Sequence, residues 1–156
     1  MLRLSLLMVG KTREGFIQDG VDFYARRLKP HLKLDLITVR EEKENPGLTP
    51  EIIKIREAAR LQDQIPPKSH LVALDPAGKE FTTEEFTDWL TRRELAARPL
   101  AFLLGGHWGL SDGVIAQADE RLALSRLTLT HELARLVLLE QLFRAMTIKA
   151  GHPYHV

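Results

Sequence analysis

The sequence predicts an α/β protein with a single domain over residues 1–156, built on a parallel-rich sheet with helices on both faces. Strand-like and helix-like segments alternate five times along the 156 residues, and such alternation is typical of parallel sheets. Two strand-like segments, residues 70–74 and 100–104, are continuously apolar, as expected for strands that are covered on both faces. No repeat, low-complexity tract or domain-splitting linker interrupts the chain.

The first half of the chain contains four expected elements. They are, in order, a strand at residues 2–9, a helix at 14–28, a strand at 32–39 and a helix at about 50–64. Gly10 ends the first strand, and Pro30 stops the amphipathic pattern of the first helix. The second strand alternates apolar and polar residues. A charged, exposed loop follows it, and Thr49 then serves as the N-cap of the next helix.

The second half contains six expected elements. They are a strand at residues 70–74, a helix at about 83–97, a strand at 100–104, a helix at about 111–120, a strand at 122–129 and a helix at about 131–149. The Thr-Thr-Glu-Glu sequence at 82–85 indicates a capping box. Ser111 caps the short helix, and Gly151 ends the last one.

Composition and charge exclude several functional classes. The chain is 44% hydrophobic and 28% charged, which is typical of a globular protein. It has no cysteine, which excludes disulfides, thiolate metal sites and a cysteine nucleophile. The net charge of +1 lacks the basic excess of a general nucleic-acid binder, so contacts with RNA would need local charge or charge assembled by oligomerisation. No apolar run suits a signal peptide or a membrane span, and we expect a cytoplasmic protein without membrane contact.

The loops after Leu74, after Leu104 and around Leu127 each follow an apolar strand, and they are the candidate ligand loops. In open α/β sheets, ligands bind outside the carboxyl ends of the strands. Glycines at 105, 106 and 109 would let a ligand approach the backbone, although they could equally form only a tight turn. The sequence is neither a G-x-G-x-x-G fingerprint nor a P-loop, which disfavours dinucleotides and triphosphates.

The last helix and the tail carry further candidates. The helix has a broad apolar stripe, which predicts core packing together with a self-association face. Arg135, Glu140 and Arg144 lie on the polar flanks of this stripe. The tail, GHPYHV, is unusual for a frayed chain end. Its two histidines lack a carboxylate or cysteine at ligand spacing, so we expect no metal site.

Three segments resemble one known family. They are LLGGHWGLSDG at residues 103–113, LTLTHELARLVLLEQLFRA at 127–145 and HPYH at 152–155. Together they resemble SPOUT-class methyltransferases of large-subunit ribosomal RNA, and more narrowly the small bacterial enzymes, the methyltransferase H family, that methylate N3 of a pseudouridine. The resemblance covers essentially the whole chain. One departure is His107, where the family commonly has a proline.

This resemblance implies a C-terminal trefoil knot, which general topology rules disfavour and which periodicity cannot reveal. It implies S-adenosylmethionine as the methyl donor, without a metal, and a homodimer whose site uses both subunits. The residues that would contact the donor are Leu74, Gly105, Leu124, Ser125, Arg126, Leu127, Thr128 and Leu129.

The resemblance also suggests roles in catalysis. N3 of pseudouridine is poorly nucleophilic while protonated, and His155 could act as the base that removes its proton. Tyr154 could position the acceptor or stack on it, and Arg135 and Arg144 could hold phosphate or the developing anion. His131 would support the donor loop. The alternative for Tyr154 and His155 is a tail that only packs on the partner subunit.

Two rival functions stay open from the sequence. One is a SPOUT-class enzyme that acts on transfer RNA, and the other is a non-catalytic dimer that docks on ribosomes or binds an adenosyl ligand. For the favoured function, the near-zero net charge indicates recognition of a folded ribosomal surface. We therefore expect activity on assembled ribosomes and little on naked RNA.

Overall fold

The structure is a computed structural model that describes residues 1–154. Its strands are β1 (Arg3–Val9), β2 (Lys33–Val39), β3 (His70–Lys79), β4 (Leu100–Leu104) and β5 (Glu120–Leu122). Its helices are α1 (Gly15–Leu28), α2 (Pro50–Gln64), α3 (Thr83–Leu95), α4 (Asp112–Gln117) and α5 (His131–Lys149). The observed order of elements confirms the predicted alternation.

The five strands form one sheet in the order β2-β1-β4-β3-β5, and every neighbouring pair is parallel. The parallel-rich sheet predicted from the sequence is therefore confirmed. Because all strands run the same way, the loops that follow them meet at one edge. The candidate ligand loops follow β4, β3 and β5, which are adjacent in the sheet.

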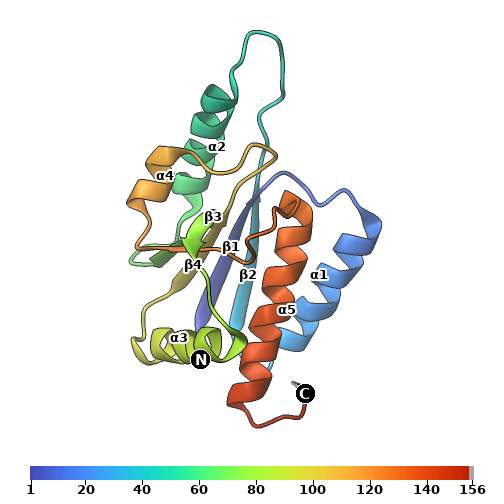
Figure 1. Cartoon of the computed structure of the whole chain (residues 1–156), viewed down its shortest axis with the longest axis vertical. Coiled ribbons are helices and arrows are strands. Elements are labelled where there is room, and N and C mark those ends of the chain that lie inside the picture. The colour runs from blue at the N-terminus through green and yellow to red at the C-terminus, as the bar shows by residue number, and fades with distance from the viewer. Residues whose placement is uncertain (155–156) are drawn as a thin grey trace.

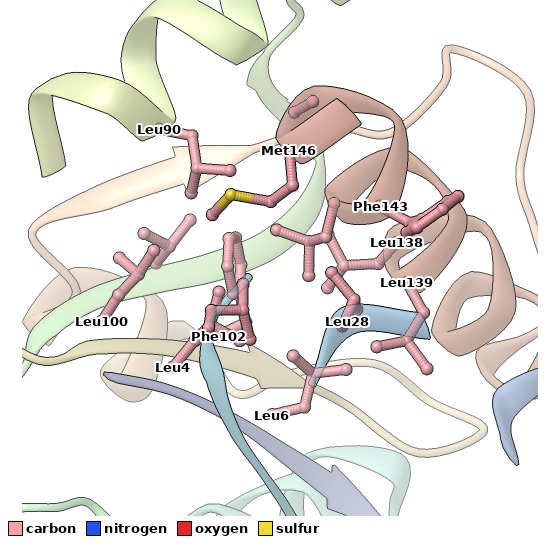
Figure 2. Close-up of a cluster of buried hydrophobic side chains, with 14 of the residues drawn as sticks. Leu4, Leu6, Leu28, Leu90, Leu100, Phe102, Leu138, Leu139, Phe143 and Met146 are labelled. Atoms are coloured by element: carbon pink, nitrogen blue, oxygen red, sulfur yellow. The ribbon is translucent and has the colours of Figure 1, made fainter. Parts of the chain in front are cut away.

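Helices cover both faces of the sheet (Figure 1): α1, α3 and α5 lie on one face, and α2 and α4 lie on the other. The alternation of side chains along β1 explains how both faces are filled. Leu4 and Leu6 point to the α5 side, whereas Leu7 and Val9 point to the α2 side. Figure 2 shows the larger cluster, in which Phe102 of β4 packs beneath leucines of α5. Burial on both faces accounts for the continuously apolar strands.

Two predicted strands have different bounds in the structure. The last strand was expected at residues 122–129, but β5 ends at Leu122 and residues 123–130 form a loop. The alternating pattern there is misleading, because Leu127 is 79% exposed rather than buried. Conversely, β3 extends past Leu74 to Lys79 through a register shift against β5. Gly78 permits this, since a Cβ there would lie 2.8 Å from the backbone of β5.

Smaller differences concern helix ends and threading. α4 ends at Gln117 and α3 at Leu95, each two or three residues before the expected end, within the usual uncertainty of helix boundaries. The predicted N-caps Thr49, Ser111 and the capping box at Thr82 are confirmed by their hydrogen bonds. The knotted threading of the C-terminal segment stays a prediction.

Candidate active site

The loops after β3, β4 and β5 surround a single cavity of about 1230 Å³ at the carboxyl edge of the sheet. Seven of the eight residues expected to contact a donor line it: Leu74, Gly105, Leu124, Ser125, Leu127, Thr128 and Leu129. The eighth, Arg126, is outside the lining, and its exposed guanidinium lies 3.7 Å from Glu80. The segments that line this cavity were therefore predicted from the sequence, although residues 123–129 form a loop rather than the expected strand.

The glycine turn after β4 is tightly folded, and Gly105 makes this possible. A Cβ at Gly105 would lie 2.3 Å from the carbonyl carbon of Gly109, far inside van der Waals contact. Gly106 and Gly109 pair as an isolated bridge, and Gly109 has a φ of +85°, which favours glycine. At its glycines the turn presents backbone to the cavity, and His107 and Trp108 of the same turn also line it.

The loop of residues 123–130 is rich in unused backbone donors. Its one internal turn is closed by a hydrogen bond from Leu127 N to the Ser125 hydroxyl, at 2.9 Å. Within residues 1–154, the N–H groups of Leu124, Ser125 and Thr128 have no hydrogen-bond acceptor. Leu124 and Ser125 are half-buried, where backbone groups are normally paired, so their N–H groups are available to a ligand that enters the cavity, whereas the exposed Thr128 can bond to water.

The start of α5 forms another wall of the cavity and holds the loop between β1 and α1. The carboxylate of Glu132 accepts hydrogen bonds from Arg13 N at 2.8 Å and Glu14 N at 3.1 Å. Arg135 donates to the Val9 carbonyl at 2.5 Å and to the Thr12 hydroxyl at 2.9 Å. Sequence reasoning missed Glu132, because its partners are more than a hundred residues earlier in the chain.

Arg135 differs from the expectation that it lies on a polar flank of the last helix. Its side chain is buried, with 1% exposed, and burial lowers the pKa of its guanidinium. The reason is the packing of α5 against the β1–α1 loop, which turns this position inward. Arg135 therefore contacts the loop rather than solvent.

Two histidines line the cavity. His131 is half-buried at the first position of α5, and His107 is exposed on the glycine turn. Burial, with the nearby charge of Arg135, lowers the pKa of His131. The His131 ring is therefore neutral at pH 7, as suits a wall that receives an uncharged or cationic group.

Tyr154 is held on the surface of α5. Its ring packs against Phe143 with 4.9 Å between centroids, and the Arg144 guanidinium lies 4.9 Å from its centre. Its hydroxyl donates to Glu140 at 3.1 Å and lies 3.4 Å from that of Tyr24. Burial and these hydrogen bonds raise the pKa of Tyr154, so its phenol is neutral at pH 7. Glu140 and Arg144 form the expected i,i+4 ion pair.

The tail and the cavity lie at opposite ends of α5 (Figure 1). The tail folds back along α5, so that Tyr154 contacts Glu140, six residues after Ala134, the last residue of α5 in the cavity lining; at about 1.5 Å per residue this is roughly 9 Å of helix. Within one chain, Tyr154 is outside the cavity lining. His155, the expected base, lies outside the described residues.

A family model described as "Predicted SPOUT methyltransferase" matches residues 2–155. The chain belongs to the SPOUT methyltransferase family. A relative from Geobacter sulfurreducens, named "Ribosomal RNA large subunit methyltransferase H", is 41% identical over 155 residues, with 99% of each chain covered. A relative from Methanoregula boonei, named "Putative ribosomal RNA large subunit methyltransferase H", is 40% identical over 158 residues, again with 99% of each covered.

The fold of this SPOUT methyltransferase also resembles that of a solved structure. It is the crystal structure of a probable methyltransferase from Bordetella pertussis Tohama I, with a TM-score of 0.56 and 19% identity. The match covers 93% of this chain and 96% of that one. At this identity, the likeness shows the fold alone.

Two features are absent from the part of this SPOUT methyltransferase that the structure describes. In residues 1–154, no helix combines the length and apolarity needed to cross a membrane. The same residues hold no cluster of three or more His, Asp or Glu that could bind a metal ion.

The SPOUT methyltransferase also carries a buried carboxylate behind the glycine turn. Glu57 of α2 is 4% exposed and accepts a hydrogen bond from Glu42 N at 3.0 Å. Its other oxygen has no partner in the described chain and faces Gly106, where a Cβ would lie 3.2 Å away. Burial raises the pKa of Glu57.

We expect Glu57→Gln to stabilise the protein at pH 7. Because the folded-state pKa is raised, the protonated carboxyl favours folding below its ordinary value near 4.5, and that advantage is lost as the pH rises through the folded-state value. Glutamine keeps the acceptor for Glu42 N without the unpaired charge. The gain should be about 1 kcal/mol, or roughly 2–4 °C in Tm, in thermal unfolding at pH 7.

The matched control is Glu51→Gln, an exposed carboxylate in the first turn of the same helix. That change should lower Tm slightly, because it removes a negative charge from the positive end of the helix dipole. A Glu57→Gln protein that melts below the wild type at pH 7 would contradict the assignment.

Proposed function

We propose that this SPOUT methyltransferase transfers a methyl group from S-adenosylmethionine to N3 of a pseudouridine in large-subunit (23S) ribosomal RNA. The observation that carries this proposal is the convergence of the three candidate loops on one cavity at the carboxyl edge of the sheet. The names of relatives that are about 40% identical over their full length support the ribosomal RNA substrate. A ribosomal substrate implies work in the cytoplasm.

The residues of the cavity fit such a donor. The volume of about 1230 Å³ exceeds the range of roughly 300–1,000 Å³ for a small-molecule pocket, which leaves room for an acceptor base beside the donor. The glycine turn and the unpaired N–H groups of Leu124 and Ser125 would hold it by backbone contacts. When bound, the donor supplies an electrophilic methyl group on a positive sulfur centre.

The acceptor needs a base. The imide proton must leave N3 before its lone pair can attack the methyl carbon, while the C–S bonding electrons return to sulfur. We assign this proton to His155 and the positioning of the base edge to Tyr154. The neutral phenol of Tyr154 suits hydrogen bonding or stacking rather than proton removal.

A homodimer resolves the separation between the tail and the cavity. Because they lie at opposite ends of α5, a two-fold partner that crosses this helix can bring its tail to the cavity. Leu133, Leu136 and Val137 are only partly buried in the single chain and continue the apolar stripe of α5. Each site would then combine the donor loops of one protomer with the tail of its partner.

The test is to incubate the purified protein with labelled S-adenosylmethionine and either ribosomes or deproteinised RNA from cells that lack this enzyme. Mapping the label should place one methyl group on a pseudouridine of the large-subunit RNA, with little incorporation into naked RNA. Label on transfer RNA would support the rival substrate. Donor binding without transfer would support a non-catalytic dimer, and either result would overturn the proposal.

A further inference from the structure

We propose that the β1–α1 loop is an RNA-contacting rim of the donor cavity, and that Glu132 and Arg135 are the residues that position it. In this arrangement Lys11 contacts a phosphate and Phe16 stacks on a base of the substrate RNA. The inference rests on the proposed function and names the contacts that would bring ribosomal RNA to the site.

The loop is fixed to α5 along its whole length. Four hydrogen bonds tie it to Glu132 and Arg135, through Val9 O, Thr12 Oγ1, Arg13 N and Glu14 N. Gly10 N also donates to Val39 O at 2.8 Å. These bonds lie on both sides of Lys11 and connect the loop to the start of α5, which also lines the donor cavity.

The burial of Arg135 points to a role in holding the loop. The guanidinium is buried with no carboxylate within ion-pair distance in the described residues, and its Nε has no hydrogen-bond acceptor there. A buried charge without a partner charge is costly, and an apolar side chain of similar volume would pack more favourably. Arg135 donates two hydrogen bonds that an apolar residue could not, one to the Val9 carbonyl and one to the Thr12 hydroxyl. These bonds hold the loop in place.

The loop and the first turn of α1, which follows it, display two side chains suited to RNA, Lys11 on the loop and Phe16 on α1. Phe16 lines the cavity although it is 69% exposed. Exposed aromatic rings are the side chains on which RNA-binding proteins stack single-stranded bases. Lys11 is exposed and forms no ion pair among the described residues, whereas Arg13 is paired with Glu41. Lys11 is therefore a cation available to a phosphate, and it lies three residues before the exposed carboxylate of Glu14, which lines the cavity.

The first experiment measures steady-state methylation of ribosomes and, separately, donor affinity by calorimetry. Lys11→Ala should raise KM for ribosomes about fivefold and reduce by about one the slope of log affinity against log salt. Phe16→Ala should raise KM about tenfold. Lys11→Ala, whose side chain is outside the cavity lining, should change donor affinity by less than about twofold, and neither variant should change kcat by more than about twofold. The control Arg92→Ala, an exposed cation on α3 away from this loop, should leave all three quantities unchanged.

The second experiment tests positioning. Glu132→Ala should raise KM for ribosomes about fivefold. Glu132→Gln keeps an acceptor oxygen, so its KM should lie close to the wild-type value. Because Glu132 acts through the loop, the Lys11→Ala/Glu132→Ala double variant should be no worse than about the worse single variant. If the two increases in KM multiply in the double variant, Glu132 does not act through the loop. The positioning role is also overturned if Glu132→Ala changes donor affinity alone.

The outcomes separate this inference from the proposed function. If the wild-type protein neither binds nor methylates ribosomes, the proposed function fails. If it methylates them and neither Lys11→Ala nor Phe16→Ala changes KM for ribosomes, the RNA-contacting role of the loop is wrong and the proposed function stands. If Phe16→Ala instead changes the oligomeric mass in solution, the surface is a subunit interface and the rim is likewise overturned.

Discussion

A Gly105→Ala enzyme is expected to bind S-adenosylmethionine at least about 30-fold more weakly than the wild type, or about 2 kcal/mol. The methyl group would lie 2.3 Å from the Gly109 carbonyl carbon and 2.7 Å from Leu110 N. Both are backbone atoms, which cannot rotate away as a flexible side chain can. The turn must therefore open, and its backbone groups would leave the wall of the cavity. Calorimetric titration with the donor measures the effect.

The control for this change is Gly113→Ala in α4, where a Cβ would meet no atom within 4 Å. Alanine favours helices over glycine, so this variant should bind the donor normally and unfold at a slightly higher temperature. Wild-type donor affinity in a folded Gly105→Ala protein would show that the glycine turn does not hold the donor.

Removal of residues 154–156 is expected to reduce methylation of ribosomes at least about 100-fold, on the scale of losing a general base. Donor affinity should change by less than about twofold, because the tail lies at the other end of α5 from the cavity of its own chain. The measurement is the single-turnover rate on ribosomes with saturating donor. A truncated, folded dimer with full activity would remove the tail from the mechanism.

Coexpression of the truncated chain with full-length Gly105→Ala distinguishes a shared site from a self-contained one. In a mixed two-fold dimer, one site has an intact cavity from the truncated subunit and an intact tail from its partner, while the other site has neither. Random pairing makes half of the dimers mixed, so about one quarter of the wild-type activity should return. No recovery in verified mixed dimers would show that each site is built from one chain.

Much of the fold could be predicted because local signals agreed with the global arrangement. The continuously apolar strand at Leu100–Leu104 indicated burial on both faces, and Thr49, Thr82 and Ser111 marked helix starts by their capping chemistry. The loops after Leu74 and Gly105 were likewise predictable, because carboxyl ends of parallel strands share one edge.

The remainder depends on contacts between distant segments. Residues 123–130 have the alternating pattern of a strand, but β3 offers no further pairing partner beyond Lys79, and the segment leaves the sheet. Arg135 has the spacing of a flanking polar residue, and only the position of the β1–α1 loop turns it inward. The partners of Glu132 could not be inferred from periodicity, because hydrogen bonds to a distant backbone leave no pattern in the sequence.

The placement of functional groups at the two ends of α5 constrains how this chain can vary. Inserting or deleting one residue in a helix rotates everything beyond it by about 100° and shifts it by about 1.5 Å. Such a change would swing Tyr154 to another side of the molecule while leaving the donor loops in place. The charged segment 40–48 does not set the distance or rotation between the tail and the donor loops. Differences in chain length between homologues should therefore accumulate there, and α5 should keep a fixed number of turns.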